Sequence, residues 1–213
     1  MTRILLVRHG ESVTNLKKVF AGHLDIDLTE RGMEQAKCTA RFIKDNYKVD
    51  KIYTSDLIRA YNTGKALADI SDLEIETDSG LREVDAGVWE NMPFDEIVEK
   101  YGEEFKLWIT ETDLARPTGG ESATELAERI DATLRKIAKA NDGKTIVVVS
   151  HSTPIRIMRC LVTTNDFHEM KNTRRVSNAS VSVLDYNDGK WSFAAIGLDQ
   201  HLKEIKTKPH DAI

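Results

Sequence analysis

The chain has 213 residues, which is enough for one domain with a sizeable buried core. Its 30 Lys and Arg residues against 35 Asp and Glu residues give a net charge of −5, with no long run of one sign. This balance argues against a nucleic-acid partner and a basic membrane-binding patch, but not against a small anionic substrate. No apolar run reaches the length of a signal-peptide core or a transmembrane helix, so we expect a cytoplasmic protein with no membrane partner.

Strand and helix signals alternate along the chain. Short apolar or alternating segments predict strands at residues 4–7, 51–54, 73–77, 145–150, 181–186 and 191–196. Helical spacing of apolar residues begins at or just after Thr29, Leu57, Ser122 and Pro154. The start at Ser122 is the clearest of these, because Glu125 completes a capping box three residues further on.

This alternation predicts βαβ units and therefore an α/β fold. Three layers, α/β/α, are expected around a central, mostly parallel sheet. The last two strands, joined at Asn187-Asp188-Gly189, instead predict a β-hairpin. Residues 82–120 have a less regular pattern, which we interpret as a lid-like excursion. With no repeat and no linker, we predict one domain over residues 1–213.

Three of the predicted strands are followed by residues suited to bind a phosphate group. Arg8 and His9 come directly after the first strand, Arg59 lies in the first turn of the helix after the second, and His151 follows the strand at 145–150. Ligands of open α/β sheets bind beyond the carboxyl ends of the strands, so we expect these side chains to converge. Arginine holds phosphate oxygens through paired hydrogen bonds, and histidine can attack phosphorus. The pattern predicts a phosphoryl-binding pocket.

A carboxylate beside such a pocket can serve as a proton donor. The segment 81–90 is rich in acidic residues, and spacing alone leaves Glu83, Asp85 and Glu90 as alternatives. The six histidines form no pair at metal-ligand spacing, and there is no Cys-x-x-Cys cluster. Glycine-rich nucleotide loops are missing as well, so we predict neither a metal site nor a cofactor.

Six motifs follow one another in a specific order. They are Arg8–Glu11 with Asn15, Phe20–Asp25 with Leu28–Gly32, Ser55–Ala60, Glu83 with Gly87–Glu90, Pro117–Ser122, and Val149–His151. Together they resemble the histidine phosphatase superfamily, in its phosphoglycerate mutase-like branch, over nearly the whole chain.

The resemblance implies a phosphoglycerate mutase-like fold and a role for each matching residue. It implies that His9 is the nucleophile, that Glu83 is the proton donor, and that the phosphoryl group is held by Arg8, Arg59 and His151. The further substrate-binding residues that we predict are Ser12, Asn15, Gly22 and Ser152.

Two positions depart from the family pattern. The spacing of the motifs also indicates which members of the branch the chain resembles. Asn91 and Ser152 stand where the family often has glycine, although neither change removes a charged group. The 37 residues of segment 84–120 separate the Glu83 and Glu121 motifs. This spacing resembles the short phosphatases, whereas the mutases of the branch carry a longer insertion.

The predicted function is a metal-independent phosphomonoesterase that hydrolyses a small phosphorylated metabolite through a phosphohistidine. One alternative is a bisphosphoglycerate-dependent phosphoglycerate mutase, and another is a catalytically silent protein that binds a phosphorylated ligand. The partner is a small phosphate ester of open identity, and an edge strand would allow, but does not specify, a homodimer. Candidate selectors of the substrate are residues 17–23, Trp89, Lys100, Lys106, Trp108 and Arg116.

Overall fold

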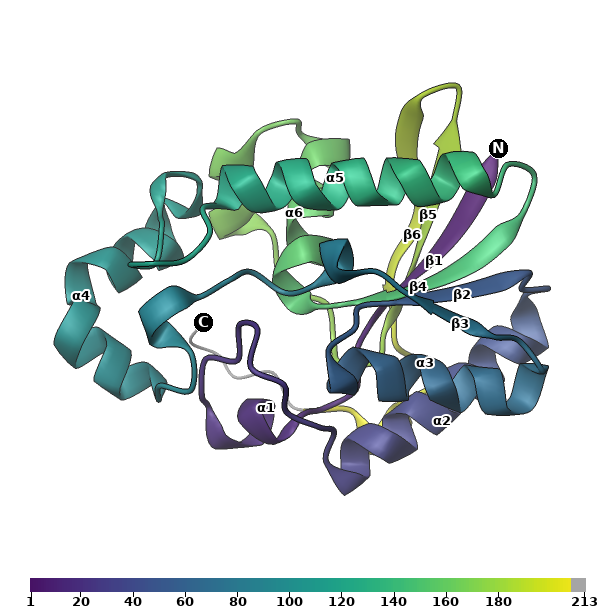
Figure 1. The fold of residues 1–213 in the computed structure, drawn as a ribbon, viewed down its shortest axis with the longest axis horizontal. Coiled ribbons are helices and arrows are strands. Elements are labelled where there is room, and N and C mark those ends of the chain that lie inside the picture. Colours follow the sequence, from purple (N-terminus) through teal and green to yellow (C-terminus); the bar gives the residue numbers. More distant parts are fainter. Residues whose placement is uncertain (208–213) are drawn as a thin grey trace.

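A computed structural model describes residues 1–207, which form a six-stranded sheet with helices on both faces (Figure 1). Its strands are β1 (Thr2–Arg8), β2 (Lys51–Thr54), β3 (Ile75–Thr77), β4 (Thr145–Ser150), β5 (Val181–Asn187) and β6 (Lys190–Leu198). Its α-helices are α1 (Val13–Lys17), α2 (Glu30–Asn46), α3 (Ile58–Ser71), α4 (Phe94–Thr110), α5 (Ala123–Ala140) and α6 (Ser152–Thr163).

The sheet is mostly parallel, as predicted. The strand order is β3-β2-β4-β1-β5-β6, and all pairs from β3 to β1 are parallel. Strand β5 runs antiparallel to both β1 and β6, and β5 and β6 form the predicted hairpin. The two apolar strands β1 and β4 therefore lie side by side at the centre, where a strand is buried on both faces.

Two apolar cores lie on opposite faces of this sheet, because successive side chains of a strand point to opposite sides. In β1, Ile4 and Leu6 belong to the core on the side of α5 and α6. Leu5 and Val7 belong to the core on the side of α2 and α3. Figure 1 shows α5 on one side of the sheet and α2 and α3 on the other. The predicted three-layer α/β/α fold is confirmed.

Local signals in the sequence determine where helices and turns begin. The side chain of Thr29 caps α2 by accepting from the backbone N–H three residues further on (3.0 Å). Ser122 and Glu125 form the predicted capping box at the start of α5. At the hairpin turn, Asp188 and Gly189 have φ values of 48° and 80°, the left-handed conformation that a tight two-residue hairpin turn requires.

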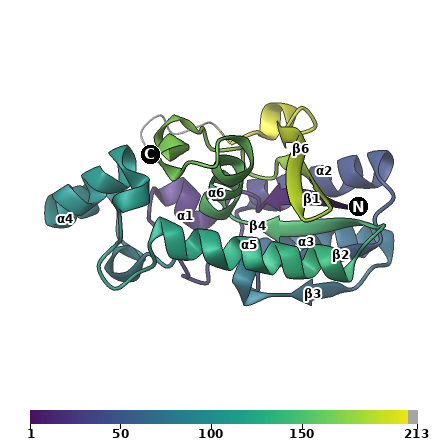
Figure 2. The ribbon, with the colours of Figure 1, turned by 90° about the horizontal axis from the view of Figure 1, so that it is seen from above.

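The segment 82–120 is more regular than its sequence pattern predicts, because 17 of its residues form the helix α4. Pro93 precedes this helix, and Tyr101 kinks it with a non-helical backbone (φ −131°, ψ 34°). In both ribbon views α4 extends beyond the end of the sheet (Figures 1 and 2). A kinked helix therefore forms the outer part of the excursion, and its interpretation as a lid stays a prediction.

Candidate active site

The carboxyl ends of β1, β2 and β4 meet at one edge of the sheet. Parallel pairing sets Arg8 opposite Ser150, and the N–H of His9 donates to the Ser150 carbonyl (3.0 Å). Strand β4 then leads directly to His151, which occupies the N-cap position of α6 without a side-chain capping hydrogen bond. Strand β2 leads to α3, where Arg59 is the second residue. The register of the sheet thus brings the predicted residues to one edge.

A small cavity of about 70 Å³ lies at this edge. Eight of the residues predicted for the site line it, namely Arg8, His9, Ser12, Asn15, Gly22, Arg59, Glu83 and Ser152. His151 does not line the cavity: its ring lies against that of His9, with the ring centroids 5.1 Å apart. Thr153 and Arg175 line the cavity as well, and the sequence did not predict either of them.

His9 is held as a neutral ring with its lone pair available. The ring is 4% exposed, and its Nδ1 lies 2.6 Å from the Gly10 carbonyl, which only accepts hydrogen bonds. Nδ1 therefore carries the proton, and Nε2 has the free electron pair. Burial, together with the positive charges of Arg59 and Arg8, holds the pKa of His9 well below its usual value. A neutral imidazole of this kind is a competent nucleophile.

His151 is fully buried behind His9, and neither of its ring nitrogens has a hydrogen-bond partner among the described residues. The pKa of His151 is held well below its usual value, mainly because the ring is buried and secondly because of the positive charge of Arg59. A neutral His151 can donate one hydrogen bond to a bound group without adding a positive charge.

Two arginines present positive charge to the cavity without a carboxylate partner of their own. Arg59 is 1% exposed and donates to the carbonyls of Leu24 (2.6 Å) and Gly22 (2.8 Å). Arg8 donates to the carbonyl of Val176 (2.7 Å). Burial lowers the pKa of both, to about 10 for Arg8, so Arg8 stays charged at neutral pH. Carbonyls orient these groups without neutralising them, which suits the binding of an anion.

Glu83 is the carboxylate that faces the cavity, among the three that spacing left open. It is 8% exposed, and its oxygens accept from the N–H of Val84 (2.9 Å) and from that of Thr153 (3.2 and 3.3 Å) in the first turn of α6. Asp85 accepts a hydrogen bond within its own turn. Glu90 accepts from the backbone N–H groups of His23 and, within its own turn, Ala86. Only Glu83 is thus placed to exchange a proton with a bound ester.

Ser12 and Asn15 form a capping box at the start of α1. Oδ1 of Asn15 accepts from the N–H of Ser12 (3.1 Å), and it also accepts from the side chain of Asn178 (3.1 Å). The same Asn178 amide donates to the carbonyl of His9 (3.1 Å). These bonds fix the oxygen of Asn15 and leave its NH₂ group with no partner among the described residues, so this group can donate to a ligand.

Gly22 and Ser152 contribute in different ways. Gly22 has a φ of 50°, and a side chain there would overlap Glu90. Its carbonyl accepts from Arg59, so it positions that arginine in addition to lining the cavity. Ser152, where the family often has glycine, adds a hydroxyl with no partner among the described residues.

Several selector candidates belong to the core or the surface. Trp89 and Trp108 are 0% and 2% exposed and pack edge-to-face, so their interpretation as substrate contacts was wrong. Lys100 is paired with Glu96 within α4. Arg116 is paired with Glu125 and lies outside the cavity. Of the selector segment 17–23, residues 19–22 do line it.

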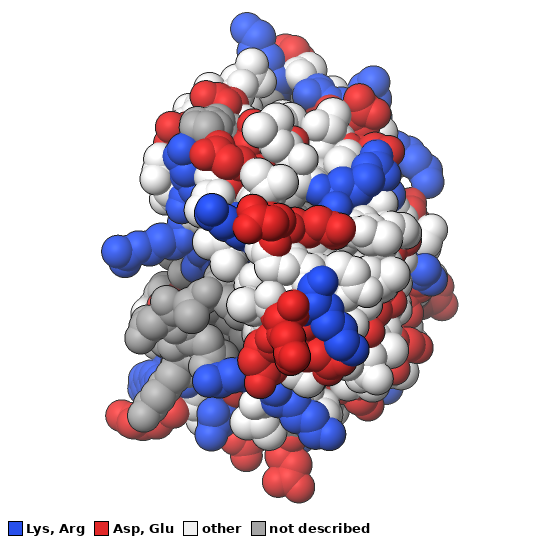
Figure 3. Space-filling view, turned by 90° about the vertical axis from the view of Figure 1, so that its left-hand side faces the viewer, with Lys and Arg blue, Asp and Glu red and all other residues white. Residues whose placement is uncertain are grey.

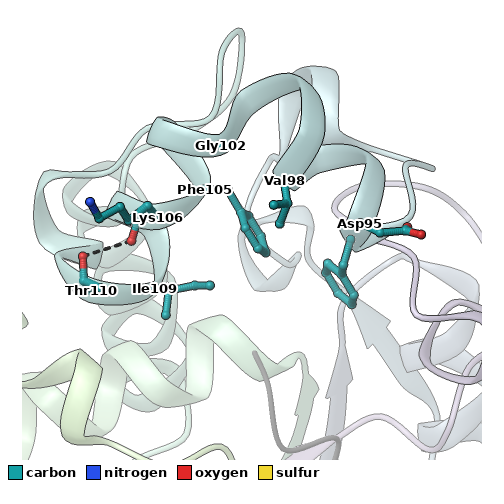
Figure 4. A pocket seen from close by; sticks show the side chains of 8 residues that line it. Asp95, Val98, Gly102, Phe105, Lys106, Ile109 and Thr110 are labelled. Carbon is teal, nitrogen blue, oxygen red and sulfur yellow. Dashed lines mark hydrogen bonds between the residues drawn. The ribbon is translucent and has the colours of Figure 1, made fainter.

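A second, larger cavity of about 430 Å³ lies along α4. Its lining is mostly apolar and includes Phe94, Val98, Phe105 and Ile109, together with Lys106. Figure 4 shows the aromatic and aliphatic side chains gathered on the inner side of the kinked helix. Phe94 also lines the cavity of about 70 Å³ that holds His9, which is called the catalytic cavity below, so the two spaces share a lining residue.

The face of the molecule on the side of α4 carries charges of both signs over its described part (Figure 3). On the described part of the face in Figure 3, acidic and basic side chains alternate with uncharged ones. Within residues 1–207, no helix is long and apolar enough to cross a membrane. The same residues contain no group of three or more His, Cys, Asp or Glu side chains arranged to hold a metal ion.

A buried neutral histidine, two uncompensated arginines and a carboxylate at the ends of parallel strands define a site for phosphoryl transfer. Residues 4–199 match the histidine phosphatase superfamily (branch 1). The chain belongs to this family. It is a phosphatase that acts on small phosphorylated metabolites, as predicted, and the alternative of a silent binding protein is set aside.

The relatives extend over nearly the whole chain. Phosphoserine phosphatase 1 of Hydrogenobacter thermophilus is 34% identical over 213 residues, 100% of both chains. The probable phosphoglycerate mutase GpmB of Yersinia pestis is 34% identical over 191 residues, 90% of this chain and 88% of that protein.

Solved structures share the fold. Phosphoserine phosphatase of Entamoeba histolytica, in complex with 3-phosphoglyceric acid, has a TM-score of 0.83 and 30% identity, and the match covers 95% of this chain and 100% of that one. YhfR of Bacillus stearothermophilus has a TM-score of 0.91 at 24% identity, over 95% and 100% of the two chains.

Proposed function

We propose that His9 is the nucleophile that removes the phosphoryl group from the ester. The hydrogen bond from Nδ1 to the Gly10 carbonyl (2.6 Å) is the observation that carries this proposal. It supports a tautomer whose lone pair is on Nε2, and the lowered pKa of His9 supports a neutral ring at physiological pH. When Nε2 bonds to phosphorus the ring becomes cationic, and the same carbonyl stabilises the proton that remains on Nδ1.

In the first step, Nε2 of His9 forms a bond to phosphorus while the bond from phosphorus to the ester oxygen breaks. Arg8 and Arg59 meet the charge on the non-bridging oxygens, and His151 donates one hydrogen bond to them. Glu83 gives its proton to the departing oxygen, which leaves as an alcohol. The product is a phosphohistidine and an ionised Glu83.

In the second step, the ionised Glu83 takes a proton from a water molecule, and the water oxygen attacks phosphorus. The P–N bond breaks, phosphate leaves, and His9 returns to its neutral form with Glu83 protonated again. Asn15, Ser12 and Ser152 are proposed to hold the phosphoryl group during both steps. Their support is that they line the cavity with hydroxyl or amide groups.

Hydrolysis is proposed in preference to mutase activity. The support is the short segment between the Glu83 and Glu121 motifs and the relative named phosphoserine phosphatase, which matches over its full length. In a mutase the same phosphohistidine would return its phosphoryl group to a phosphoglycerate, as the relative named probable phosphoglycerate mutase suggests.

The decisive experiment measures phosphate release from a panel of small phosphomonoesters in the presence of a chelator, with the wild type and His9→Ala. Release that survives chelation and is lost by a factor of roughly 10⁴ or more in His9→Ala is expected. Interconversion of 2- and 3-phosphoglycerate without release would favour the mutase. Release that persisted in His9→Ala would overturn the mechanism.

We also propose one domain over residues 1–213 (208–213 lie outside the described residues), with the excursion at 82–120 acting as a lid, in a cytoplasmic protein. The lid proposal is supported by Phe94, which borders both cavities. The two free cysteines support a reducing compartment. The open edge of β6 supports a homodimer. Light scattering of the purified chain would measure its mass and test the dimer.

A further inference from the structure

Arg175 lines the catalytic cavity but has no role in the steps proposed above. It lies in the loop between the 3₁₀ segment Phe167–Asn172 and β5. Burial lowers the pKa of its guanidinium, and the nearby charge of Glu83 acts in the opposite direction. Among the described residues it makes no hydrogen bond or ion pair. An unpaired guanidinium that faces a reaction cavity is available to a substrate.

The backbone on both sides of Arg175 is held in place. The carbonyl of Thr173 accepts from Arg156 of α6 (2.8 Å), and the carbonyl of Val176 accepts from Arg8 (2.7 Å). The carbonyl of Arg174 accepts from a further arginine of α6. The origin of the Arg175 side chain is therefore fixed relative to Arg8, which reduces the ordering that binding would require.

The charges of the cavity are not balanced by a phosphoryl group alone. Arg8, Arg59 and Arg175 line it, and Glu83 is the one carboxylate among the described lining residues. Burial, and next the charge of Arg175, lower the pKa of Arg8 to about 10, so Arg8 remains charged at neutral pH. When Glu83 holds the proton for the leaving group it is neutral, and the residues that line the cavity then carry three positive charges. A phosphomonoester supplies about two negative charges, which leaves one unmatched.

We propose that Arg175 binds a carboxylate on the part of the substrate that remains after phosphate removal, so that the preferred esters are short phosphorylated carboxylic acids. This rests on the proposed function, because it uses the same cavity. A carboxylate suits the planar fork of arginine through two parallel hydrogen bonds. The small size of the cavity, about 70 Å³, and the closeness of Arg175 to Arg8 require that the two anionic groups lie a few bonds apart.

The test compares esters that differ by one carboxylate. One pair is 3-phosphoglycerate and glycerol 3-phosphate, and the other is phosphoserine and phosphoethanolamine. For each pair, the ratio of kcat/KM values is measured for the wild type, Arg175→Met and Arg175→Lys. Arg174→Met is the matched control, because Arg174 is the exposed neighbouring arginine and lies outside the cavity.

In at least one pair the wild type is expected to favour the ester with the carboxylate. Arg175→Met should reduce that ratio by about 10- to 100-fold, mainly through KM, as expected for one charge-assisted hydrogen-bonded pair. Arg175→Lys should restore part of the ratio, and Arg174→Met should leave it as in the wild type.

Two results would overturn the proposal: a wild type that favours neither carboxylated ester, or an Arg175→Met ratio equal to that of the wild type. Equal losses on both members of a pair belong to the second result, because they would indicate a structural effect or a contact to the phosphoryl group. Failure of the proposed function is distinguishable, since it would appear as phosphate release by His9→Ala.

Discussion

The catalytic cavity and the cavity along α4 share Phe94 but differ in how they are built. The catalytic cavity is small and lies where three strands end. The backbone carbonyl of Gly10 orients the neutral ring of His9, and those of Gly22 and Leu24 orient the guanidinium of Arg59. The cavity along α4 is larger and mostly apolar, and it lies on a kinked helix beyond the sheet. The first is fixed by the sheet register, whereas the second depends on one helix.

This difference suggests that the catalytic cavity carries out the phosphoryl transfer, whereas the cavity along α4 contributes only to substrate binding. The α4 cavity offers apolar side chains such as Phe105 and Val98, while the charged ends of Asp95 and Lys106 point away from it (Figure 4). Substitutions in the catalytic cavity should therefore change kcat by large factors. Substitutions along α4 should change only the binding of the non-phosphoryl part of an ester.

Glu83→Gln tests the catalytic side of this comparison most strongly. Glutamine keeps an oxygen that can accept from the N–H groups of Val84 and Thr153 but has no proton to give, so the fold should be retained. We expect turnover of alkyl phosphates to fall roughly 10²- to 10⁴-fold. Nitrophenyl phosphate should lose far less, because its leaving group needs little protonation. Equal losses on both esters would remove Glu83 from the acid role.

Arg59→Lys tests whether the guanidinium fork, and not charge alone, is needed. Lysine keeps the charge but has one nitrogen, so it cannot hold the carbonyls of both Gly22 and Leu24 and also face the phosphoryl group. We expect kcat to fall about 10²-fold, the size seen when one oxyanion donor is removed. Arg82→Lys, at an arginine that pairs with Asp56 outside the cavity, is the control. A loss below threefold in Arg59→Lys would contradict this account.

The buried neutral histidines should make the protein sensitive to acid. The pKa of His151 is held far below its usual value of about 6.5 in the folded state, while the unfolded chain takes up a proton near that pH. Acidification below pH 6.5 therefore favours unfolding, by up to about 1.4 kcal/mol per pH unit for each such histidine. Urea unfolding between pH 7 and pH 5 should show a shallower pH dependence in His151→Gln than in the wild type. The same pH dependence in both would place the titration elsewhere.

The parts of the fold and site that the sequence predicted share one property: their signal is local. The strand at 145–150, the capping box at Ser122 and the turn at Gly189 are each defined by a few neighbouring residues. The convergence of His9 and His151 follows from one rule, because parallel strands end at the same edge of a sheet.

The parts that the sequence did not predict depend on distant contacts. Arg175 and Asn178 reach the site because β5 pairs with β1, and no spacing in the sequence marks that loop. Helix α4 is a different case, because its apolar residues do recur at helical spacing, at Phe94, Ile97, Tyr101, Phe105 and Trp108, and the prediction missed this local signal. Trp89 was assigned to a substrate contact because residue type alone does not distinguish a core ring from a binding one.

Ile109→Ser should have the smallest effect on activity, and it tests whether the cavity along α4 takes part in catalysis. Ile109 lines the α4 cavity and is 41% exposed, so the substitution should change the stability of the fold by less than about 0.5 kcal/mol. Because no charged group of the reaction lies in that cavity, kcat should be unchanged and KM for a small ester should change less than about twofold. Phe94→Ala is the informative partner, since Phe94 borders both spaces and its loss should raise KM more than Ile109→Ser does. A fall in kcat in Ile109→Ser would show that α4 takes part in the reaction, and the assignment of catalysis to the catalytic cavity alone would then be wrong.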